Sequence, residues 1–343
     1  MSMPSTVRTA VVGCGYWGKN LVRNFHRLSD LRLCCDSSDK VRASIAAAYP
    51  DVQVTADYDA VLADADVQAV ILATPAPSHA AMAIRALEAG KHVFVEKPLA
   101  LNAADARAIV DAAAEADRIL MVGHLLEYHP AVNYIKDMID SGELGDVYYL
   151  YSQRLNLGKV RADENALWSL APHDISVALY LMGEAPEEVE ASGQAFLQDG
   201  VEDVTFVTLR FASGRVAHIH VSWLDPHKER RLTVVGTRRM VVFNDMEPQE
   251  KIKVYDKGVD RPRTEAAEYD SYAELLQLRE GDIIIPRLPL SEPLALECSE
   301  FLRAVETGVP PRSDGADGLR VVETLESAQA ALDRNHVTYG PGR

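Results

Sequence analysis

A short strand that runs directly into a glycine-rich turn and then a helix constrains this chain more than any other feature. Residues 6–12 are mostly apolar, residues 13–18 read Gly-Cys-Gly-Tyr-Trp-Gly, and residues 19–28 have helical spacing. In such a turn the first glycine permits the tight bend, the second lets the backbone approach a phosphate, and the third allows close helix packing. The helix start adds free amides and a partial positive charge. The pattern predicts a dinucleotide site formed by Gly13, Gly15, Tyr16, Trp17 and Gly18, with a chance glycine turn as the alternative.

The residue after the second strand decides which dinucleotide is expected. Leu31–Cys35 reads as a strand and ends at Asp36, about twenty residues after the glycines. A carboxylate at this point binds the 2′-hydroxyl of the NAD ribose and repels the 2′-phosphate of NADP. We therefore predict NAD as the cofactor, while NADP stays open because Ser37, Ser38 and Lys40 follow closely. The alternative for Asp36 is a strand-end acid that starts a loop.

Strands and helices continue to alternate as far as residue 123, which predicts an α/β domain with a parallel, doubly wound sheet of the Rossmann type over residues 1–123. Further strands are expected at 52–55, 67–73, 93–95 and 119–122, and helices at 41–48, 59–63, 80–89 and 103–116. The turn after the strand 67–73 contains Thr74, Pro75 and His79, which we predict to border the cofactor. A surface histidine at a helix start is the alternative for His79.

The stretch His92–Leu99 combines a buried strand with a charged end. Its first residues are apolar, and Glu96, Lys97 and Pro98 follow them. Chemistry in open α/β sheets is placed at such carboxyl ends. A lysine held there half desolvated can transfer a proton or polarise a substrate oxygen, so Lys97 is a catalytic candidate. We also predict that Glu96 and Lys97 border the cofactor. The alternative is a surface lysine paired with Glu96.

Composition limits the partners and the compartment. The chain has 343 residues, a hydrophobic share of 48% and a formal net charge of -16. This length suits two globular domains, and the acidic balance argues against nucleic acid or an anionic membrane as the main partner. The four cysteines have neither metal-ligand nor disulfide spacing, and no apolar run reaches the roughly 18 residues of a membrane span. We therefore expect a cytoplasmic protein without a metal site.

The pattern of strands in residues 124–343 predicts a second domain. A helix at 129–141 comes first, and strands are expected at 147–153, 204–211, 216–223, 231–235 and 239–243. A sheet that covers one face with its own helices leaves its other face open. An apolar open face predicts self-association, so we expect a homo-oligomer. Residues 254–287 are polar and irregular, and we predict a long excursion there.

Polar and basic residues gather just before a histidine at position 173. The first group contains Arg154, Asn156, Lys159, Arg161 and Asn165, and a second basic group lies at 228–239. In so acidic a chain these groups indicate an anionic substrate, because arginine binds phosphate or carboxylate through two hydrogen bonds. A solvated strand face is the alternative, and for 228–239 it is an equal one.

Four motifs together resemble the glucose-fructose oxidoreductase, inositol dehydrogenase and MocA (Gfo/Idh/MocA) family. They are the glycine turn at 13–18, Ala-Thr-Pro at 73–75, Val-Glu-Lys-Pro-Leu at 95–99 and Val-Gly-His at 122–124, and the resemblance extends through 292–319. It implies a nicotinamide-dependent dehydrogenase or reductase of sugars or cyclitols. It also implies a Rossmann-type domain followed by a domain with a large open antiparallel sheet, and a cis Lys97–Pro98 bond.

The same resemblance gives His173 its role. Residues 168–176 are similar to a second family motif, in which an acid and a histidine stand four residues apart and the histidine faces the nicotinamide. His173 matches the histidine, whereas Ser169 occupies the position of the acid. Asp174 does not simply replace that acid, because neighbouring helical side chains point about 100° apart. The alternative for His173 is a helix-start residue that caps the backbone, just before an apolar helix that is expected at 177–182.

These residues predict an NAD-dependent dehydrogenase that oxidises a secondary ring hydroxyl of a sugar. The resemblance narrows this to the 3-hydroxyl of a UDP-N-acetylhexosamine or its uronate. Lys97 and His173 are the predicted catalytic residues, and the predicted substrate contacts are Tyr128, Arg154, Asn156, Arg161, Asn165, Ser169 and His173. A cyclitol or free-sugar dehydrogenase and a ketosugar reductase are the alternatives among enzymes. A non-catalytic sensor of NAD or a sugar nucleotide is the alternative of another class, and the presence of both Lys97 and His173 speaks against it.

Overall fold

The computed structural model describes residues 5–158, 160–162, 164–260 and 277–334, which divide into two compact units. Unit one comprises the described residues of Met1–His129 and of Ser291–Glu326, and unit two those of Pro130–Leu290 and of Ser327–Arg343. We predicted a single division after residue 123. The structure instead divides after His129 and returns a later segment to unit one, which the local sequence pattern did not indicate.

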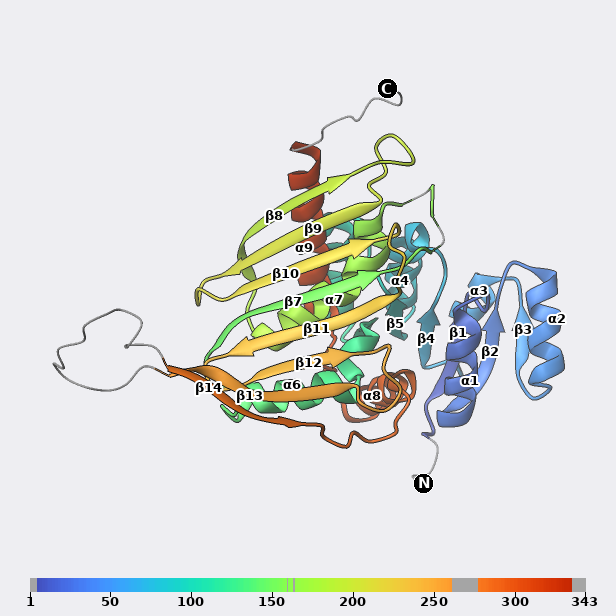
Figure 1. Ribbon diagram of the computed structural model, residues 1–343. Coiled ribbons are helices and arrows are strands. Elements are labelled where there is room, and N and C mark those ends of the chain that lie inside the picture. The colour runs from blue at the N-terminus through green and yellow to red at the C-terminus, as the bar shows by residue number, and fades with distance from the viewer. Residues whose placement is uncertain (1–4, 159, 163, 261–276, 335–343) are drawn as a thin grey trace, which may run out of the picture. The chain divides into compact units, whose positions relative to one another are not determined.

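Unit one is built on a six-stranded parallel sheet in the order β3-β2-β1-β4-β5-β6 (Figure 1). Its strands are β1 (Arg8–Val12), β2 (Asp30–Cys35), β3 (Gln53–Thr55), β4 (Ala69–Leu72), β5 (His92–Glu96) and β6 (Leu120–Gly123). The strand order reverses between β1 and β4, and ligands of doubly wound sheets bind at the carboxyl ends of the strands beside such a reversal. The predicted doubly wound fold is confirmed.

The helices of unit one include α8 (Pro293–Thr307), which comes from the late segment of the chain that returns to this unit. They are α1 (Gly18–Leu28), α2 (Asp39–Ala48), α3 (Tyr58–Ala63), α4 (His79–Glu88), α5 (Ala103–Glu115) and α8, with short 3₁₀ turns η1 (Ala76–Ser78) and η2 (Leu125–Tyr128) and the first part of α9 (Gly315–Arg334). Phe301 of α8 meets Phe25 of α1 and Phe94 of β5 edge to face, with ring centroids 6.2 Å and 5.7 Å apart. Each ring is fully buried, so α8 completes the apolar core.

Unit two is built on an eight-stranded sheet in the order β14-β13-β12-β11-β7-β10-β9-β8 (Figure 1). Its strands are β7 (Val147–Leu155), β8 (Pro186–Gln194), β9 (Val204–Phe211), β10 (Val216–Ser222), β11 (Glu229–Gly236), β12 (Met240–Asn244), β13 (Ile252–Asp260) and β14 (Gln277–Ile284). Neighbouring strands are antiparallel except β7 and β10, which run parallel. The predicted large antiparallel sheet is confirmed, with this one parallel pair added.

One face of the large sheet is covered by helices. The helices α6 (Pro130–Asp140) and α7 (Ala166–Met182) contact it, α7 on β7, β9 and β10, and α6 on β12. Side chains alternate along each strand, so every second residue of β7 faces away from α7. Tyr149 and Tyr151 are on that other face, with their rings stacked at a centroid distance of 6.3 Å.

The prediction of an irregular excursion at 254–287 is wrong for the described part of that segment. β13 and β14 fill much of it and pair antiparallel at the edge of the large sheet, and residues 261–276 lie outside the described residues. Both strands carry charged residues, and the edge strand β14 is exposed along nearly its whole length, so no run of buried apolar residues marked it in the sequence. None of the helices in the described ranges combines the length and the apolar character needed to cross a bilayer.

Candidate active site

The glycine turn between β1 and α1 has the shape that the sequence predicted. Gly13 has a φ of +86°, and a Cβ placed there would lie 2.7 Å from the backbone carbonyl of Ala73. A Cβ on Gly18 would lie 1.8 Å from the carbonyl oxygen of Gly13, whereas one on Gly15 would meet nothing within 4 Å. The first and third glycines are therefore required by packing inside the protein, and Gly15 keeps one side of the turn open.

Asp36 is fixed against this turn. Its Oδ2 accepts a hydrogen bond of 2.8 Å from the amide of Cys14, and its Oδ1 accepts one of 2.9 Å from the amide of Ser38. Arg42 donates to the backbone carbonyl of Asp36 at 2.6 Å. The carboxylate thus lies beside the glycine turn at the end of β2, where the sequence predicted the acid that binds the ribose.

Unit one therefore fits a bound dinucleotide. No side chain caps the first turn of α1, because Trp17 occupies the position where a capping residue would stand. The open side at Gly15 and the uncapped amides of α1 suit a pyrophosphate, and Asp36 suits a ribose. Tyr16 is 90% exposed beside the same turn, so its ring is accessible to a ligand there.

Trp17 links the glycine turn to the Glu96-Lys97 pair. Its indole Nε1–H donates to Oε1 of Glu96, the last residue of β5. Oε2 of Glu96 accepts the amide of Lys97 at 3.3 Å, and the neighbouring strand β6 ends in Gly123, where a Cβ would come within 3.0 Å of the same oxygen. Burial raises the pKa of Glu96 to about 7, although Trp17 and Lys97 favour the ionised form.

Lys97 is half-buried and directly follows β5, so its predicted position at a carboxyl strand end is confirmed. The Lys97–Pro98 bond is cis, as the resemblance implied.

The turn after β4 holds itself in place through hydrogen bonds. Ser78 donates from its Oγ to Oγ1 of Thr74 at 2.9 Å, and its amide donates to the carbonyl of Pro75 at 3.0 Å. His79 is fully buried rather than on the surface, with Nδ1 2.8 Å from the carbonyl of Pro98 and Nε2 2.8 Å from that of Thr74. Burial lowers its pKa. Both ring nitrogens face backbone carbonyls, to one of which the neutral ring can donate, and this favours a role in positioning the turn over direct contact with the cofactor.

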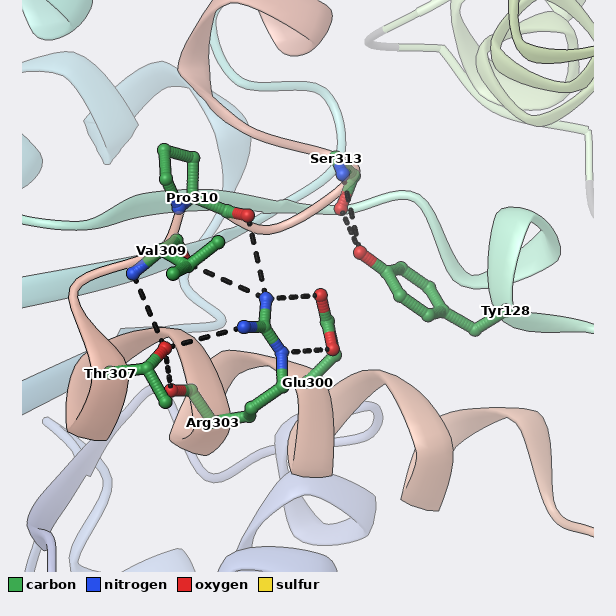
Figure 2. A network of polar contacts seen from close by, with 7 residues as sticks. All are labelled: Tyr128, Glu300, Arg303, Thr307, Val309, Pro310 and Ser313. Carbon is green, nitrogen blue, oxygen red and sulfur yellow. Dashed lines mark hydrogen bonds and ion pairs between the residues drawn. The ribbon is translucent and has the colours of Figure 1, made fainter.

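Tyr128, a predicted substrate contact, is buried instead. Its hydroxyl and the Oγ of Ser313 are 3.0 Å apart, and Figure 2 shows the hydroxyl of Tyr128 pointing to Ser313 in the loop that follows α8. In the same view Arg303 forms an ion pair with Glu300 and lies close to the carbonyl oxygens of Val309 and Pro310, which fixes that loop. Burial raises the pKa of Tyr128. We therefore withdraw Tyr128 from the substrate-binding residues.

In unit two, His173 and Ser169 share one helix. Both lie within α7, four residues apart, so their side chains are on the same face, and both are half-buried. The sequence predicted a helix only from Val177 onward. Pro172, which lies inside α7 and lacks the amide for one helical hydrogen bond, obscured the first part of the helix.

Asn165 caps this helix. Its Oδ1 accepts the amide of Trp168 at 3.1 Å, and its Nδ2 donates to Glu202 at 2.6 Å and to Gln329 at 2.9 Å. Every polar atom of this buried side chain is thus engaged within unit two. The geometry is against the predicted role of Asn165 in binding substrate.

The basic residues of unit two are mostly bound to acids of the same unit. Arg154 forms a buried ion pair with Asp174, and Arg161, which is 42% exposed, lies 2.9 Å from Glu164. Asn156 lies over Gly158, where a Cβ would collide with its amide nitrogen. In the second basic group, Arg230 lies near Asp245, Arg231 near Glu229 and Arg239 near Glu143. These ion pairs favour the alternative of a solvated strand face for that group. Lys159 lies outside the described residues.

A set of buried ionisable residues around the end of β6 was not predicted from the sequence. They are His124, Glu127, Glu297 and Asp317, and each is less than a tenth exposed. Their signal in the sequence was weak, because a charged residue in a helical pattern reads as a solvent-facing one. Within the described ranges, no group of three His, Cys, Asp or Glu side chains is arranged to hold a metal ion.

Comparison with known proteins finds domains of one oxidoreductase family in both units. Residues 7–124 match the model of an oxidoreductase family with an NAD-binding Rossmann fold, and residues 132–242 match the Gfo/Idh/MocA C-terminal domain. UDP-N-acetylglucosamine 3-dehydrogenase of Acidithiobacillus ferrooxidans is 28% identical over 95% of this chain and 97% of its own. The structure of that enzyme has a TM-score of 0.80 and covers 96% of this chain and 98% of its own, at 27% identity.

Two further relatives widen the range of activities. Inositol 2-dehydrogenase of Rhizobium meliloti is 26% identical over 94% of this chain and 96% of its own. A putative oxidoreductase of Magnetospirillum magnetotacticum is 30% identical in its solved structure, with a TM-score of 0.79 over 94% of this chain and 99% of its own. The chain, with its NAD-binding Rossmann unit and its family C-terminal domain, belongs to the Gfo/Idh/MocA family of oxidoreductases.

Proposed function

We propose that the protein is an NAD-dependent dehydrogenase that oxidises a secondary ring hydroxyl of a sugar, the 3-hydroxyl of a UDP-N-acetylhexosamine or of its uronate. The observation that carries this proposal is the position of Lys97. It follows Glu96 at the end of β5, and Glu96 is hydrogen-bonded to Trp17 in the glycine turn. The lysine is thereby placed next to the turn that suits the cofactor.

In this proposal the chain supplies the proton chemistry. His173 takes the proton of the substrate hydroxyl, and Ser169, on the same face of α7, donates a hydrogen bond to a neighbouring sugar oxygen. Lys97 stabilises the developing alkoxide through its positive charge and helps to carry the proton away. NAD, when bound, supplies the hydride acceptor. Asp36 and the glycine turn hold it, and this positioning provides much of the rate.

The proposed substrate class rests on two observations. The similarity to the UDP-N-acetylglucosamine 3-dehydrogenase spans nearly the whole of both chains. Arg161 precedes α7 and is substantially exposed, so its guanidinium is accessible to the phosphates of a nucleotide sugar even with Glu164 beside it. Arg154 and Asn165 no longer contribute to this argument, because their polar groups are engaged inside unit two.

A panel of candidate substrates tests the proposal. The purified protein is mixed with NAD and, in separate reactions, with UDP-N-acetylglucosamine, UDP-N-acetylgalactosamine, their uronates, inositol and free glucose, and the nicotinamide absorbance is followed. We expect reduction of NAD with one of the UDP-sugars, and mass spectrometry of the product should show a loss of two hydrogens. Reduction with none of the sugars or cyclitols would contradict a dehydrogenase and favour the sensor alternative.

A cyclitol dehydrogenase is the second candidate, because the inositol 2-dehydrogenase relative also matches across almost the full chain. Inositol in the same panel decides between the two. The reverse reaction, reduction of a ketosugar, is read from the oxidation of NADH when the UDP-3-ketosugar product is supplied.

We also propose that the protein is a cytoplasmic homo-oligomer that associates through the open face of the large sheet. Aromatic side chains gather on that face. Tyr149 and Phe206 are 43% and 39% exposed there, and the ring of Phe206 stacks on that of His220 at 4.3 Å. All four cysteines are buried thiols, which suits a reducing compartment. Light scattering after size exclusion should give at least twice the monomer mass, and Tyr149→Glu with Phe206→Glu should reduce it to the monomer.

A further inference from the structure

Trp17 stands at the start of α1, where a helix ordinarily has a capping residue. A serine, threonine, aspartate or asparagine at this position accepts a backbone amide of the first turn and stabilises the helix. Trp17 makes no such bond. Its indole Nε1–H donates instead to Oε1 of Glu96, 79 residues later in the chain. The side chain therefore serves a contact outside its own helix.

The strand order explains why this contact needs a long side chain. The glycine turn follows β1, Glu96 ends β5, and β4 lies between these two strands. Two strand spacings amount to about 10 Å, a distance that the short side chain of an ordinary capping residue does not span. The indole of Trp17 thus joins the glycine turn to the end of β5, across the point where the strand order reverses.

The carboxyl group of Glu96 is confined on its other sides as well. Glu96 is 9% exposed, and its Oε2 accepts the amide of Lys97 at 3.3 Å. On the neighbouring strand β6, a Cβ on Gly123 would lie 3.0 Å from that oxygen and 3.2 Å from Cδ of Glu96. The carboxyl group is therefore fixed between the indole of Trp17, the backbone of Lys97 and the end of β6.

We propose that Trp17 is a positioning residue that acts through Glu96 to fix Lys97 at the end of β5. Without the indole N–H, Oε1 of the buried carboxyl group loses its donor, and the group must turn toward another partner or take up a proton. Either response alters the contact of Oε2 with the amide of Lys97 and the charge beside the lysine. The expected effect on turnover rests on the proposed dehydrogenase function, in which Lys97 acts on the alkoxide.

A hydrogen bond that only stabilises unit one is the alternative. Tyr58 makes a bond of this kind, since its hydroxyl donates to the carbonyl of Met82 at 2.7 Å. Tyr58→Phe keeps the ring and removes one donor. It is therefore the matched control for Trp17→Phe, which also keeps an aromatic ring and removes one donor.

Chemical labelling of Lys97 tests the proposal without any substrate. The protein is treated with acetic anhydride, and mass spectrometry of its peptides gives the acylation rate of Lys97 relative to the exposed Lys228 of unit two. Trp17→Phe should raise this ratio by roughly 2- to 10-fold, the range that the net free energy of one hydrogen bond allows. Tyr58→Phe should leave it unchanged. An unchanged ratio in Trp17→Phe would overturn the proposal.

Gly123→Ala perturbs the same carboxyl group from the side of β6. Its Cβ would press on Oε2 and Cδ of Glu96, so the carboxyl group has to shift while Trp17 stays in place. The labelling ratio of Lys97 should rise in this variant too. If Trp17→Phe fails to fold, Gly123→Ala decides, and an unchanged ratio there would count against the proposal.

A double-mutant cycle shows whether Trp17 acts through Glu96. Glu96→Met removes the carboxyl group and should itself raise the labelling ratio of Lys97. Once that group is absent, Trp17→Phe should raise the ratio no further, because residues that act through one another are not additive. An equal further rise in the Glu96→Met background would overturn the proposal.

Turnover gives a readout that a stabilising bond would not move. In Trp17→Phe the kcat should fall by roughly 10-fold with little change in the KM for the sugar, and in the Lys97→Met background the same substitution should have no further effect. A raised KM with an unchanged kcat would overturn the positioning role. If labelling of Lys97 responds as expected and no sugar is oxidised, the proposed function falls and the positioning role stands.

Discussion

Arg154 and Asp174 form a buried ion pair inside unit two, with Nε 2.5 Å from Oδ2 and side chains only 12% and 8% exposed. The pair joins β7 to α7, and Asp174 is the residue after His173. Arg154 therefore fixes the helix that carries the proposed base. Asp174 neutralises the charge of Arg154 within the protein. Arg154, which the sequence predicted to bind the substrate, therefore has a positioning role instead.

Breaking this pair should destabilise the protein strongly. Arg154→Met leaves the carboxylate of Asp174 buried and uncompensated, and such a change lowers the free energy of unfolding by about 3–5 kcal/mol. Urea unfolding followed by tryptophan fluorescence measures it. The double variant Arg154→Met with Asp174→Leu should recover most of the loss because no charge remains buried. An unchanged midpoint for Arg154→Met would mean that the pair contributes little.

Arg161 should behave differently. It is 42% exposed and its pairing with Glu164 is on the surface, so Arg161→Ala should change the free energy of unfolding by less than about 0.5 kcal/mol. If it meets the phosphates of a nucleotide sugar, the same variant should weaken binding of that sugar and leave NAD binding unchanged. Calorimetric titration with each ligand measures both affinities, and an equal loss of both would indicate a role in folding.

The elements of unit one could be predicted because each repeats a strong local signal. Buried strands such as β5 are continuous apolar runs, and glycine or capping residues mark the helix ends. The return of α8 to unit one could not be predicted, since its partners Phe25 and Phe94 are some two hundred or more residues away in the sequence, and spacing carries no information on tertiary partners.

The site was predicted less completely than the fold. The glycine turn, Asp36 and Lys97 were located correctly, because a strand-end position follows from local pattern. The partners of Arg154, Asn165 and Tyr128 were not, because a polar residue in a sequence shows its chemistry but not whether an acid, a helix end or a buried serine already engages it. Asn165 could be predicted as a helix cap only if α7 was predicted to continue through Pro172.

Asp36 should make the protein select NAD over NADP. Its carboxylate is fixed by the amides of Cys14 and Ser38, so it cannot swing away from a 2′-phosphate without losing two hydrogen bonds. Fluorescence titration with NADH and NADPH should show tighter binding of NADH, and Asp36→Ser should narrow the difference. Tighter binding of NADPH to the wild type would contradict the assignment.

Glu297 should make the protein less stable than it would be with an apolar residue. It is fully buried on α8, and neither carboxyl oxygen has a hydrogen-bond partner among the described residues. Burial first, and the neighbouring Glu96 second, hold its pKa well above the usual value. Glu297→Met is close in volume and removes the unpaired group, so it should raise the free energy of unfolding by about 1–3 kcal/mol near neutral pH.

The sign of the pH dependence follows from the raised pKa of Glu297. The folded protein keeps the proton that the unfolded chain loses above the usual pKa of a glutamate, so the wild type loses stability as the pH rises from about 4.5 toward the folded pKa. The gain from Glu297→Met should therefore be larger at about pH 8 than at about pH 5. Glu300→Met on the same helix removes a half-buried acid paired with Arg303 and should give no gain at either pH.

The last prediction concerns the proposed base. His173→Asn should lower turnover by about 10²- to 10⁴-fold with little change in substrate binding, because the lost proton acceptor acts only in the reaction step. Lys97→Ala should do likewise. In the wild type, turnover should rise with pH as the imidazole loses its proton, and His173→Asn should lose that rise. Tyr128 and Asp174 do not offer a substitute base, because Tyr128 is bonded to Ser313 and Asp174 to Arg154. Near-normal turnover in His173→Asn would therefore require a base outside all of these residues, and the proposed mechanism would fail.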